Sequence, residues 1–346
     1  MPTKRIEYID AMRGFTIFLV VLHHVSSFVL MSDNPESFSF SKIFMHFRMP
    51  LFFFISGFVL YKKGFEWNLS NTLNFFRKKL PVQIISPFLF FWIYVSIEHL
   101  PFNESIFEMN KAGYWFTFVL FEFFVFYVLL NGLIQLCRVK GIMMDMIFIL
   151  GGVLFYFSCV YGLFGQLLPG TVFGLLSTYH WYFFLFFIVG VLVRKHFDRF
   201  EQLLDSRFFT TICIVVFFSF NLFPKMFDIS LTLCNLLVRL SGLFLVFAVF
   251  RKYQGVFSSS QRMGRVFQFV GRRTLDIYLL HYFFLFTNLR TVLPDFSNLN
   301  TPLVEFVVGS AVAILIIMAS LSVSLVLRTS PLLAHYLFGQ KIKSRQ

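Results

Sequence analysis

The apolar stretch Arg13-Gly-Phe-Thr-Ile-Phe-Leu-Val-Val-Leu-His23-His24 decides the fold class, because it is a membrane-helix run that holds a cation and a histidine. Eleven steps of about 100° bring His24 to within roughly 20° of Arg13 on an α-helix, about 16 Å further along the axis. Both side chains are costly in lipid, so their position inside the run favours a functional role. The alternative is that Arg13 reaches lipid phosphates and His24 is an ordinary interior histidine.

The composition is typical of an integral membrane protein. Of the 346 residues, 58% are hydrophobic and 14% are charged, and the mean hydropathy is +0.75. A soluble domain carries roughly a quarter charged residues. The net charge of +13 lies in short clusters between apolar segments, as the positive-inside rule requires, which argues against a nucleic-acid partner. The 4 cysteines form no Cys-x-x-Cys pair, and the pattern predicts neither a metal site nor a permanently bound cofactor.

The apolar segments predict an all-α membrane protein, a single bundle of about ten transmembrane helices. If the N-terminus is cytoplasmic, alternate loops are rich in Lys and Arg, so both termini are predicted to be cytoplasmic. The first run lacks a small-residue cleavage site and is expected to be a retained helix. We expect one transmembrane domain over residues 1–346, with no separate soluble domain. The predicted spans are 12–31, 43–61, 82–98, 113–136, 142–163, 179–194, 207–223, 229–250, 274–293 and 302–327.

The first helix is the leading candidate site. Asp10 and Arg13 are three residues apart and can pair on one helix face. The Arg13 guanidinium suits bidentate phosphate contacts, and histidine is the usual base for activating a hydroxyl. A long phosphorylated donor of the shape of coenzyme A could place its phosphates at Arg13 and its reactive end at His24.

Basic residues on the next two helices are further candidates. Arg48 lies near the outer end of the second span, where it either takes part in the site or reaches toward the membrane surface. Arg77, Lys78 and Lys79 form an inner basic cluster before Pro81. Such clusters usually fix topology, and the alternative is that this one binds the anionic head of a donor. Ser56-Gly57 is a small pair that favours close helix packing.

Buried polar residues occur in later spans. A carboxylate such as Glu122 in the fourth span needs a cation or a proton, and Arg239 is a candidate partner. A structural ion pair is an equally good interpretation. Tyr278 and His281 follow Asp276 in the ninth span, where they either support the site or are satisfied interior residues.

Four motifs in order resemble membrane-bound acyltransferase family three. They are Arg5-Ile-Glu-Tyr-Ile-Asp10-Ala-Met-Arg13-Gly14 with His24 after it, Met49-Pro50-Leu-Phe-Phe-Phe-Ile-Ser56-Gly57, Tyr114-Trp115-Phe116, and Thr274-Leu-Asp-Ile-Tyr278-Leu-Leu-His281. The resemblance spans nearly the whole chain. It implies transfer of an acyl group, commonly acetyl, from cytoplasmic acyl-CoA to a hydroxyl of a bacterial envelope sugar or polysaccharide, with Arg13 and His24 required.

The chain departs from the family pattern at two places. Relatives often have histidine directly before Met-Pro, where this chain has Arg48. They also often carry Arg-x-x-Arg ahead of the third helix, where this chain has Arg77-Lys78-Lys79. Both departures concern donor and acceptor contacts. They leave acyl-CoA, membrane lipid and a glycan or lipid-linked sugar as the expected partners.

A different class of protein also fits about ten helices with scattered charges, namely a secondary transporter for a polar or anionic solute. Transporters often show internal repeats and paired broken helices, and the sequence shows neither convincingly. The enzyme is therefore the favoured interpretation. The sequence does not identify the acceptor, the acyl group or the oligomeric state, and it leaves open whether His24 acts as a base or as a covalent nucleophile that relays the acyl group.

Overall fold

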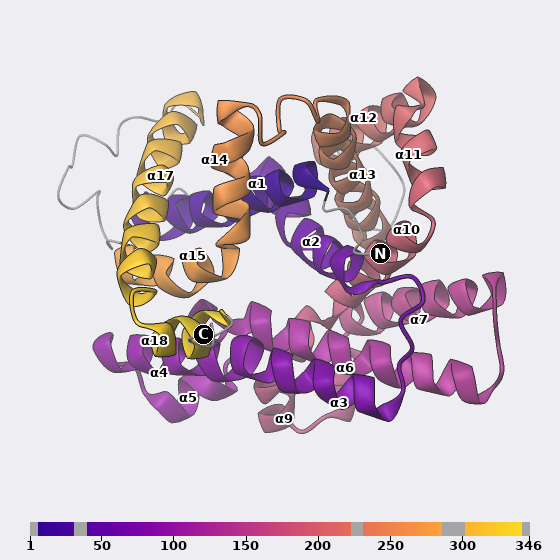
Figure 1. Cartoon of the computed structure of the whole chain (residues 1–346), viewed down its shortest axis with the longest axis horizontal. Helices are drawn as coiled ribbons and strands as arrows, with labels where there is room; N and C mark the ends of the chain where they lie inside the picture. The colour runs from indigo at the N-terminus through magenta and orange to yellow at the C-terminus, as the bar shows by residue number, and fades with distance from the viewer. Residues whose placement is uncertain (1–5, 31–39, 223–230, 286–301, 341–346) are drawn as a thin grey trace, which may run out of the picture. The chain divides into compact units, whose positions relative to one another are not determined.

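The computed structural model describes residues 6–30, 40–222, 231–285 and 302–340, and these residues form helices without any strand. They pack as two compact units. The first unit combines the chain up to Phe52 with His196–Ser324, and the second combines Phe53–Lys195 with the chain from Leu325 onward. Figure 1 shows the helices of both units, which are described separately below.

The first unit is built from the N-terminal helix and the later helices of the chain. Its elements are α1 (Glu7–His24), the π-helical turn η1 (Val25–Val29), the first half of α2 (Phe40–Leu60), α11 (Phe197–Asp205), α12 (Arg207–Leu222), α13 (Leu231–Lys252), α14 (Arg262–Arg272), α15 (Thr274–Leu280), the 3-10 turn η6 (His281–Phe284) and most of α17 (Pro302–Leu327).

The second unit holds the middle of the chain. Its elements are the end of α2, α3 (Leu69–Leu80), η2 (Pro81–Ile85), α4 (Ser86–Ile97), α5 (Phe102–Phe107), η3 (Lys111–Gly113), α6 (Trp115–Leu136), α7 (Ile142–Val160), α8 (Leu163–Leu167), α9 (Gly170–Leu175), η4 (Thr178–Phe183), α10 (Phe184–Lys195) and α18 (Pro331–Phe338).

Several helices are long and apolar enough to cross a membrane, as a multi-pass membrane protein requires. Within the described ranges there are 7, or 8 if the bent pair Phe197–Asp205 and Arg207–Asn221 forms one span. The 7 are Glu7–Val29, Ile43–Leu60, Leu69–Ile97, Trp115–Leu136, Ile142–Val160, Leu231–Lys252 and Pro302–Leu327. Each overlaps a predicted span.

The predicted count of about ten spans is not confirmed, and the differences have a physical cause. The predicted span 179–194 is divided between η4 and α10, and the 12 residues of α10 reach only about 18 Å against a hydrocarbon core of about 30 Å. The predicted span 274–293 begins with the 7 residues of α15, and its part beyond Leu285 lies outside the described residues. The predicted span 207–223 is one arm of the bent pair.

Glycines let α1 and α14 of the first unit approach each other closely (Figure 1). A Cβ added at Gly14 would lie 2.2 Å from the Phe267 carbonyl oxygen, and one at Gly271 would lie 1.8 Å from the Asp10 carbonyl oxygen. Only a residue without a side chain fits this crossing. It fixes the helix that carries Arg13 and His24 against the segment that leads into α15.

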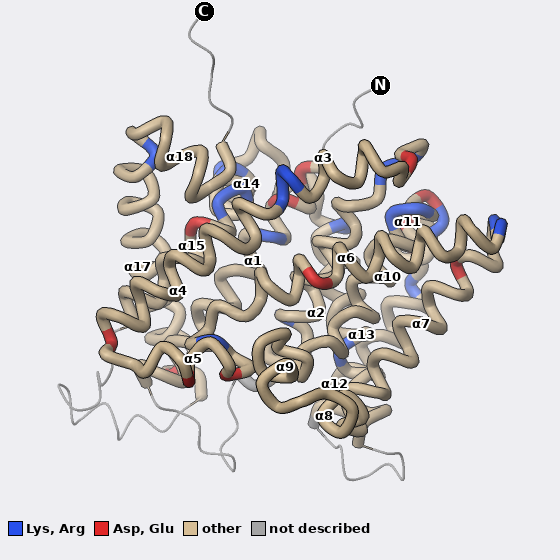
Figure 2. Tube along the Cα trace, turned by 90° about the horizontal axis from the view of Figure 1, so that it is seen from below, with Lys and Arg blue, Asp and Glu red and all other residues tan. Residues whose placement is uncertain are grey.

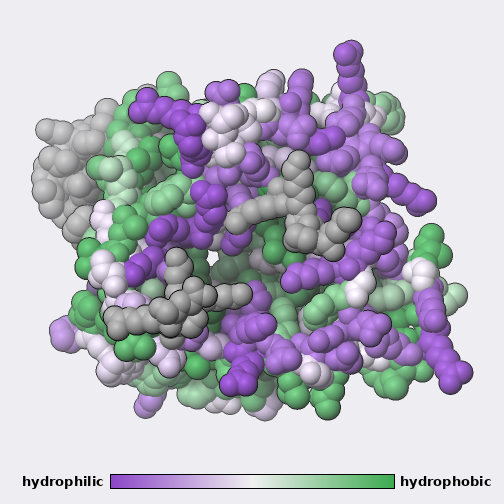
Figure 3. Space-filling model, viewed as in Figure 1, coloured by the Kyte–Doolittle hydropathy of each residue, from purple (hydrophilic) through white to green (hydrophobic). Residues whose placement is uncertain are grey.

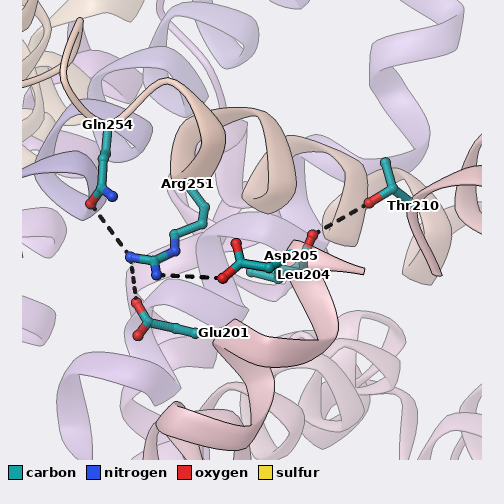
Figure 4. A network of polar contacts seen from close by, with 6 residues as sticks. All are labelled: Glu201, Leu204, Asp205, Thr210, Arg251 and Gln254. Atoms are coloured by element: carbon teal, nitrogen blue, oxygen red, sulfur yellow. Dashed lines mark hydrogen bonds and ion pairs between the residues drawn. The ribbon is translucent and has the colours of Figure 1, made fainter. Parts of the chain in front are cut away.

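Charged residues join α11 to α13 in the first unit, as Figure 4 shows. Arg251 forms ion pairs with Glu201 at 2.9 Å and with Asp205 at 3.7 Å. Figure 2 shows Lys and Arg along α11 and α14, and Figure 3 shows hydrophilic side chains over α11. The ion pairs therefore connect the last turn of the long helix α13 to the short charged helix α11.

The core of the second unit is aromatic and contains a second glycine crossing. Phe53 contacts Phe123 and Phe183 with ring centroids 5.0 Å apart in each pair. A Cβ at Gly57 would lie 2.0 Å from the Phe187 carbonyl oxygen, and Gly190 is equally tight against Phe54. The prediction that Ser56-Gly57 permits close helix packing is confirmed at Gly57.

Candidate active site

The helix α1 positions Arg13 against the start of α15. The Arg13 Nη2 donates a hydrogen bond of 3.2 Å to the Thr274 Oγ1 atom. Glu7 at the N-terminus of α1 accepts two hydrogen bonds of 2.7 Å from Ser259, which precedes α14. The helix is therefore held at its beginning by side-chain contacts and along its length by the crossing at Gly14.

His24 ends α1 and contacts the segment after α15. Its Nε2 atom lies 3.1 Å from the Tyr282 hydroxyl, and either group can be the donor. The α-helix changes to a π-helical turn at Val25, directly after His24, and such turns are frequent at functional sites. The His24 Nδ1 atom is buried and has no hydrogen-bond partner among the described residues. One nitrogen is therefore held by tyrosine, and the other is available for chemistry.

His281 lies beside His24 and is fully buried. The two ring centroids are 5.3 Å apart, and the His281 ring is 4.1 Å from the Tyr282 ring. The His281 Nδ1 atom is 2.9 Å from the carbonyl oxygens of both Ile277 and Tyr278. A carbonyl can only accept, so Nδ1 carries the proton and donates. Its Nε2 atom is buried without a partner among the described residues.

Buried polar contacts fix α15, which leads directly into His281 at the start of η6. Asp276 is 2% exposed, accepts a hydrogen bond from the Ser324 hydroxyl and lies 3.8 Å from the Arg273 guanidinium. Tyr278 is buried, with its ring centroid 6.3 Å from that of His281. Asp276 and Tyr278 therefore lie buried in the helix that precedes His281, and the supporting role of Tyr278 stays a prediction.

Other predicted site residues of the first unit lie on α1 and α2. Asp10 is buried on α1, one turn before Arg13. Arg48 lies within electrostatic range of His23 and His24. The structure thus brings Arg48 to the histidine end of α1. The predicted pairing of Asp10 with Arg13 stays a prediction.

The predicted donor-binding cluster belongs to the second unit. Arg77, Lys78 and Lys79 occupy the last turn of α3, so they are helical rather than in a loop before the helix. Arg77 and Lys78 are exposed, whereas the Lys79 ammonium lies 5.2 Å from the Phe124 ring centroid. Cations at a helix C-terminus are favourable electrostatically. The predicted contact of these three residues with a donor stays a prediction.

Glu122 also belongs to the second unit, where Trp181 is its hydrogen-bond partner. The indole Nε1 donates to the carboxylate at 2.7 Å. Arg239, the predicted partner, is a residue of the first unit, and that pairing stays a prediction.

Lys111 is a buried cation that the sequence pattern does not indicate. It is 3% exposed, and its ammonium donates to the Gly174 carbonyl at 2.7 Å and to the Ser177 hydroxyl at 2.9 Å.

Tyr282 was also absent from the predicted site. Its only sequence signal is its position directly after His281, on a segment rich in apolar residues. The contact with His24 joins residues 258 positions apart. A long-range contact of this kind comes from tertiary packing and leaves no local spacing pattern.

The arrangement in the first unit suits proton transfer at a hydroxyl. A neutral imidazole that is held by donating its Nε2–H in a hydrogen bond, here to the Tyr282 oxygen, presents a lone pair at Nδ1 and can take a proton there. His24 has such a held nitrogen, and Arg13 supplies a fixed cation about 16 Å away on the same helix.

Comparison with known proteins agrees with this geometry. A family model for an acyltransferase domain, that of acyltransferase family three, matches residues 6–321. No curated protein and no solved structure matches the chain. The matched region covers nearly the whole chain, including α1 and the histidine segment after α15, and ends within α17 before α18. This membrane protein therefore belongs to acyltransferase family three.

Proposed function

We propose that the protein is an integral-membrane O-acyltransferase that moves an acetyl group from acetyl-CoA to a hydroxyl of an envelope sugar or polysaccharide. The observation that carries this proposal is the pairing of Arg13 and His24 on α1 of a family-three acyltransferase, with Nε2 of His24 held and Nδ1 available. We place the protein in the bacterial cytoplasmic membrane, with both termini inside and acyl-CoA entering from the cytoplasm.

In the proposed reaction, His24 acts as a general base. Its Nδ1 atom takes the proton of the acceptor hydroxyl while the hydroxyl oxygen attacks the thioester carbonyl. The tetrahedral intermediate breaks its carbon–sulfur bond, and the protonated His24 returns the proton to the departing thiolate. The products are the acetyl ester and CoA with a free thiol. Acetyl-CoA is a substrate in this scheme, and no permanently bound cofactor is required.

Donor binding falls to the basic side chains. Arg13 would contact phosphate through its guanidinium, because a planar pair of N–H donors matches phosphate oxygens. Its distance of about 16 Å from His24 along α1 suits an extended pantetheine arm. Arg77, Lys78 and Lys79 would attract the nucleotide head. The exposure of Arg77 and Lys78 supports this role.

Reconstituted vesicles test the enzyme against the alternative of a transporter. Vesicles containing the purified protein receive labelled acetyl-CoA together with envelope material from cells that lack the protein. We expect mass spectrometry to detect acetyl esters on glycans, at a level absent from protein-free vesicles. Uptake of labelled solute by the vesicles without esterification would contradict the proposal and favour a transporter.

A further inference from the structure

The buried pair of His24 and His281 contains an acceptor atom for which the proposed reaction gives no role. His281 is fully buried, and its Nδ1 atom must donate because both of its partners are carbonyl oxygens, each at 2.9 Å. The neutral ring therefore presents a lone pair at Nε2. That atom has no hydrogen-bond partner among the described residues.

An unpartnered buried acceptor costs free energy, so its retention beside a reactive group indicates a ligand that satisfies it. The ring of His281 lies 5.3 Å from the ring of His24, centroid to centroid. It also lies 4.1 Å from the ring of Tyr282, whose hydroxyl contacts His24. A group that satisfies this atom is a hydrogen-bond donor, and it binds next to the ring of His24.

We propose that the His281 Nε2 atom binds the acyl acceptor by accepting a hydrogen bond from one of its hydroxyl groups. The inference rests on the proposed function and adds to it the chemistry of acceptor recognition. His24 takes the proton of the reacting hydroxyl, and His281 holds a hydroxyl of the same acceptor. A sugar presents neighbouring hydroxyls and can satisfy both histidines together.

The two ring nitrogens of His281 can be separated by substitution. In His281→Asn the side-chain amide lies near the position of Nδ1, so it can still donate to the backbone carbonyls while the Nε2 acceptor is lost. In His281→Gln the amide oxygen reaches toward the position of Nε2 and can accept a hydrogen bond, although it cannot act as a base. The same substitutions at the exposed His196 of the first unit provide the matched controls.

The experiment measures the rate of acetyl transfer by the full-length protein in vesicles. The concentrations of envelope glycan and of acetyl-CoA are varied separately. We expect His281→Asn to lower kcat/KM for the glycan about tenfold with the acetyl-CoA KM unchanged, and His281→Gln to recover most of this loss. Thermal unfolding of each purified variant verifies that it is folded.

Two outcomes overturn the inference. Near-normal transfer by His281→Asn with a damaged His281→Gln would show that only the backbone contact matters. Equal losses in both variants, with both proteins folded, would show that accepting a hydrogen bond is not the function of Nε2. A wild-type protein that transfers no acetyl group would instead refute the proposed function, and this result is read before any variant is compared.

Discussion

The Tyr282 hydroxyl lies 3.1 Å from the His24 Nε2 atom and joins the end of α1 to the segment after α15. This contact holds the His24 ring at Nε2, and its Nδ1 atom has no hydrogen-bond partner among the described residues. We therefore expect Tyr282→Phe to lower kcat about 2- to 10-fold, the value of one ordinary hydrogen bond, without changing the acetyl-CoA KM. Steady-state kinetics of acetyl transfer measure both kcat and the acetyl-CoA KM. Wild-type kcat in the phenylalanine variant would show that the hydroxyl does not orient His24.

Replacing Arg13 by lysine keeps the charge and removes the planar guanidinium. If Arg13 binds phosphate through two N–H groups, Arg13→Lys should raise the acetyl-CoA KM about tenfold and leave kcat within a factor of about two. Arg138→Lys, at an exposed position, is the control. An unchanged KM for the donor would place the phosphates elsewhere in the protein.

The crossing of α1 and α14 should tolerate no side chain at Gly271. A Cβ there would lie 1.8 Å from the Asp10 carbonyl oxygen, so Gly271→Ala should reduce the free energy of unfolding by about 1–3 kcal/mol. Gly132 on α6 has no atom within 4 Å of its added Cβ and gives the control Gly132→Ala. Thermal unfolding in detergent compares the two variants. Equal melting temperatures would contradict the tight crossing.

The buried Lys111 side chain should make the free energy of unfolding depend on pH in the alkaline range. Burial lowers the pKa of Lys111 from its usual value of 10.5 to about 8, although Glu122 and Glu108 oppose the shift. Between these two pKa values the unfolded chain binds more protons than the folded chain. The contribution of Lys111 to the free energy of unfolding therefore rises with pH. Below about pH 8 both states are protonated and this contribution is constant.

The comparison for Lys111 uses Lys111→Met, which lacks the titrating group. Unfolding is measured at intervals from about pH 7.5 to about pH 10, and the wild-type stability should rise relative to that of the variant. Parallel curves for the two proteins would mean that the pKa of Lys111 is the same in the folded and unfolded chains.

The sequence predicts those features that depend on local spacing. The position of Arg13 and His24 on one helix follows from the helical repeat, and the 7 candidate spans follow from hydropathy. The division of 179–194 into η4 and α10 does not follow, because hydropathy alone cannot distinguish a short buried helix from a spanning one.

The features that the sequence does not predict arise from tertiary contacts and unusual backbone. The contact of Tyr282 with His24 depends on how α1 packs in the first unit. Lys111 has a positive φ of 45°, followed by Ala112 at 48°, and this turn directs a lysine into the interior. Non-glycine residues rarely adopt such angles, so the sequence gives no local signal for this turn or for the burial of Lys111.

The most direct test of the account is acetyl transfer by His24→Ala, compared with the wild-type protein and with His23→Ala. Equal amounts of folded protein are placed in vesicles with labelled acetyl-CoA and envelope glycans. Loss of a general base predicts a fall in kcat of about 10²- to 10⁴-fold for His24→Ala, while His23→Ala stays active. Glycan acetylation by folded His24→Ala at the wild-type rate would contradict the assignment of His24 as the base.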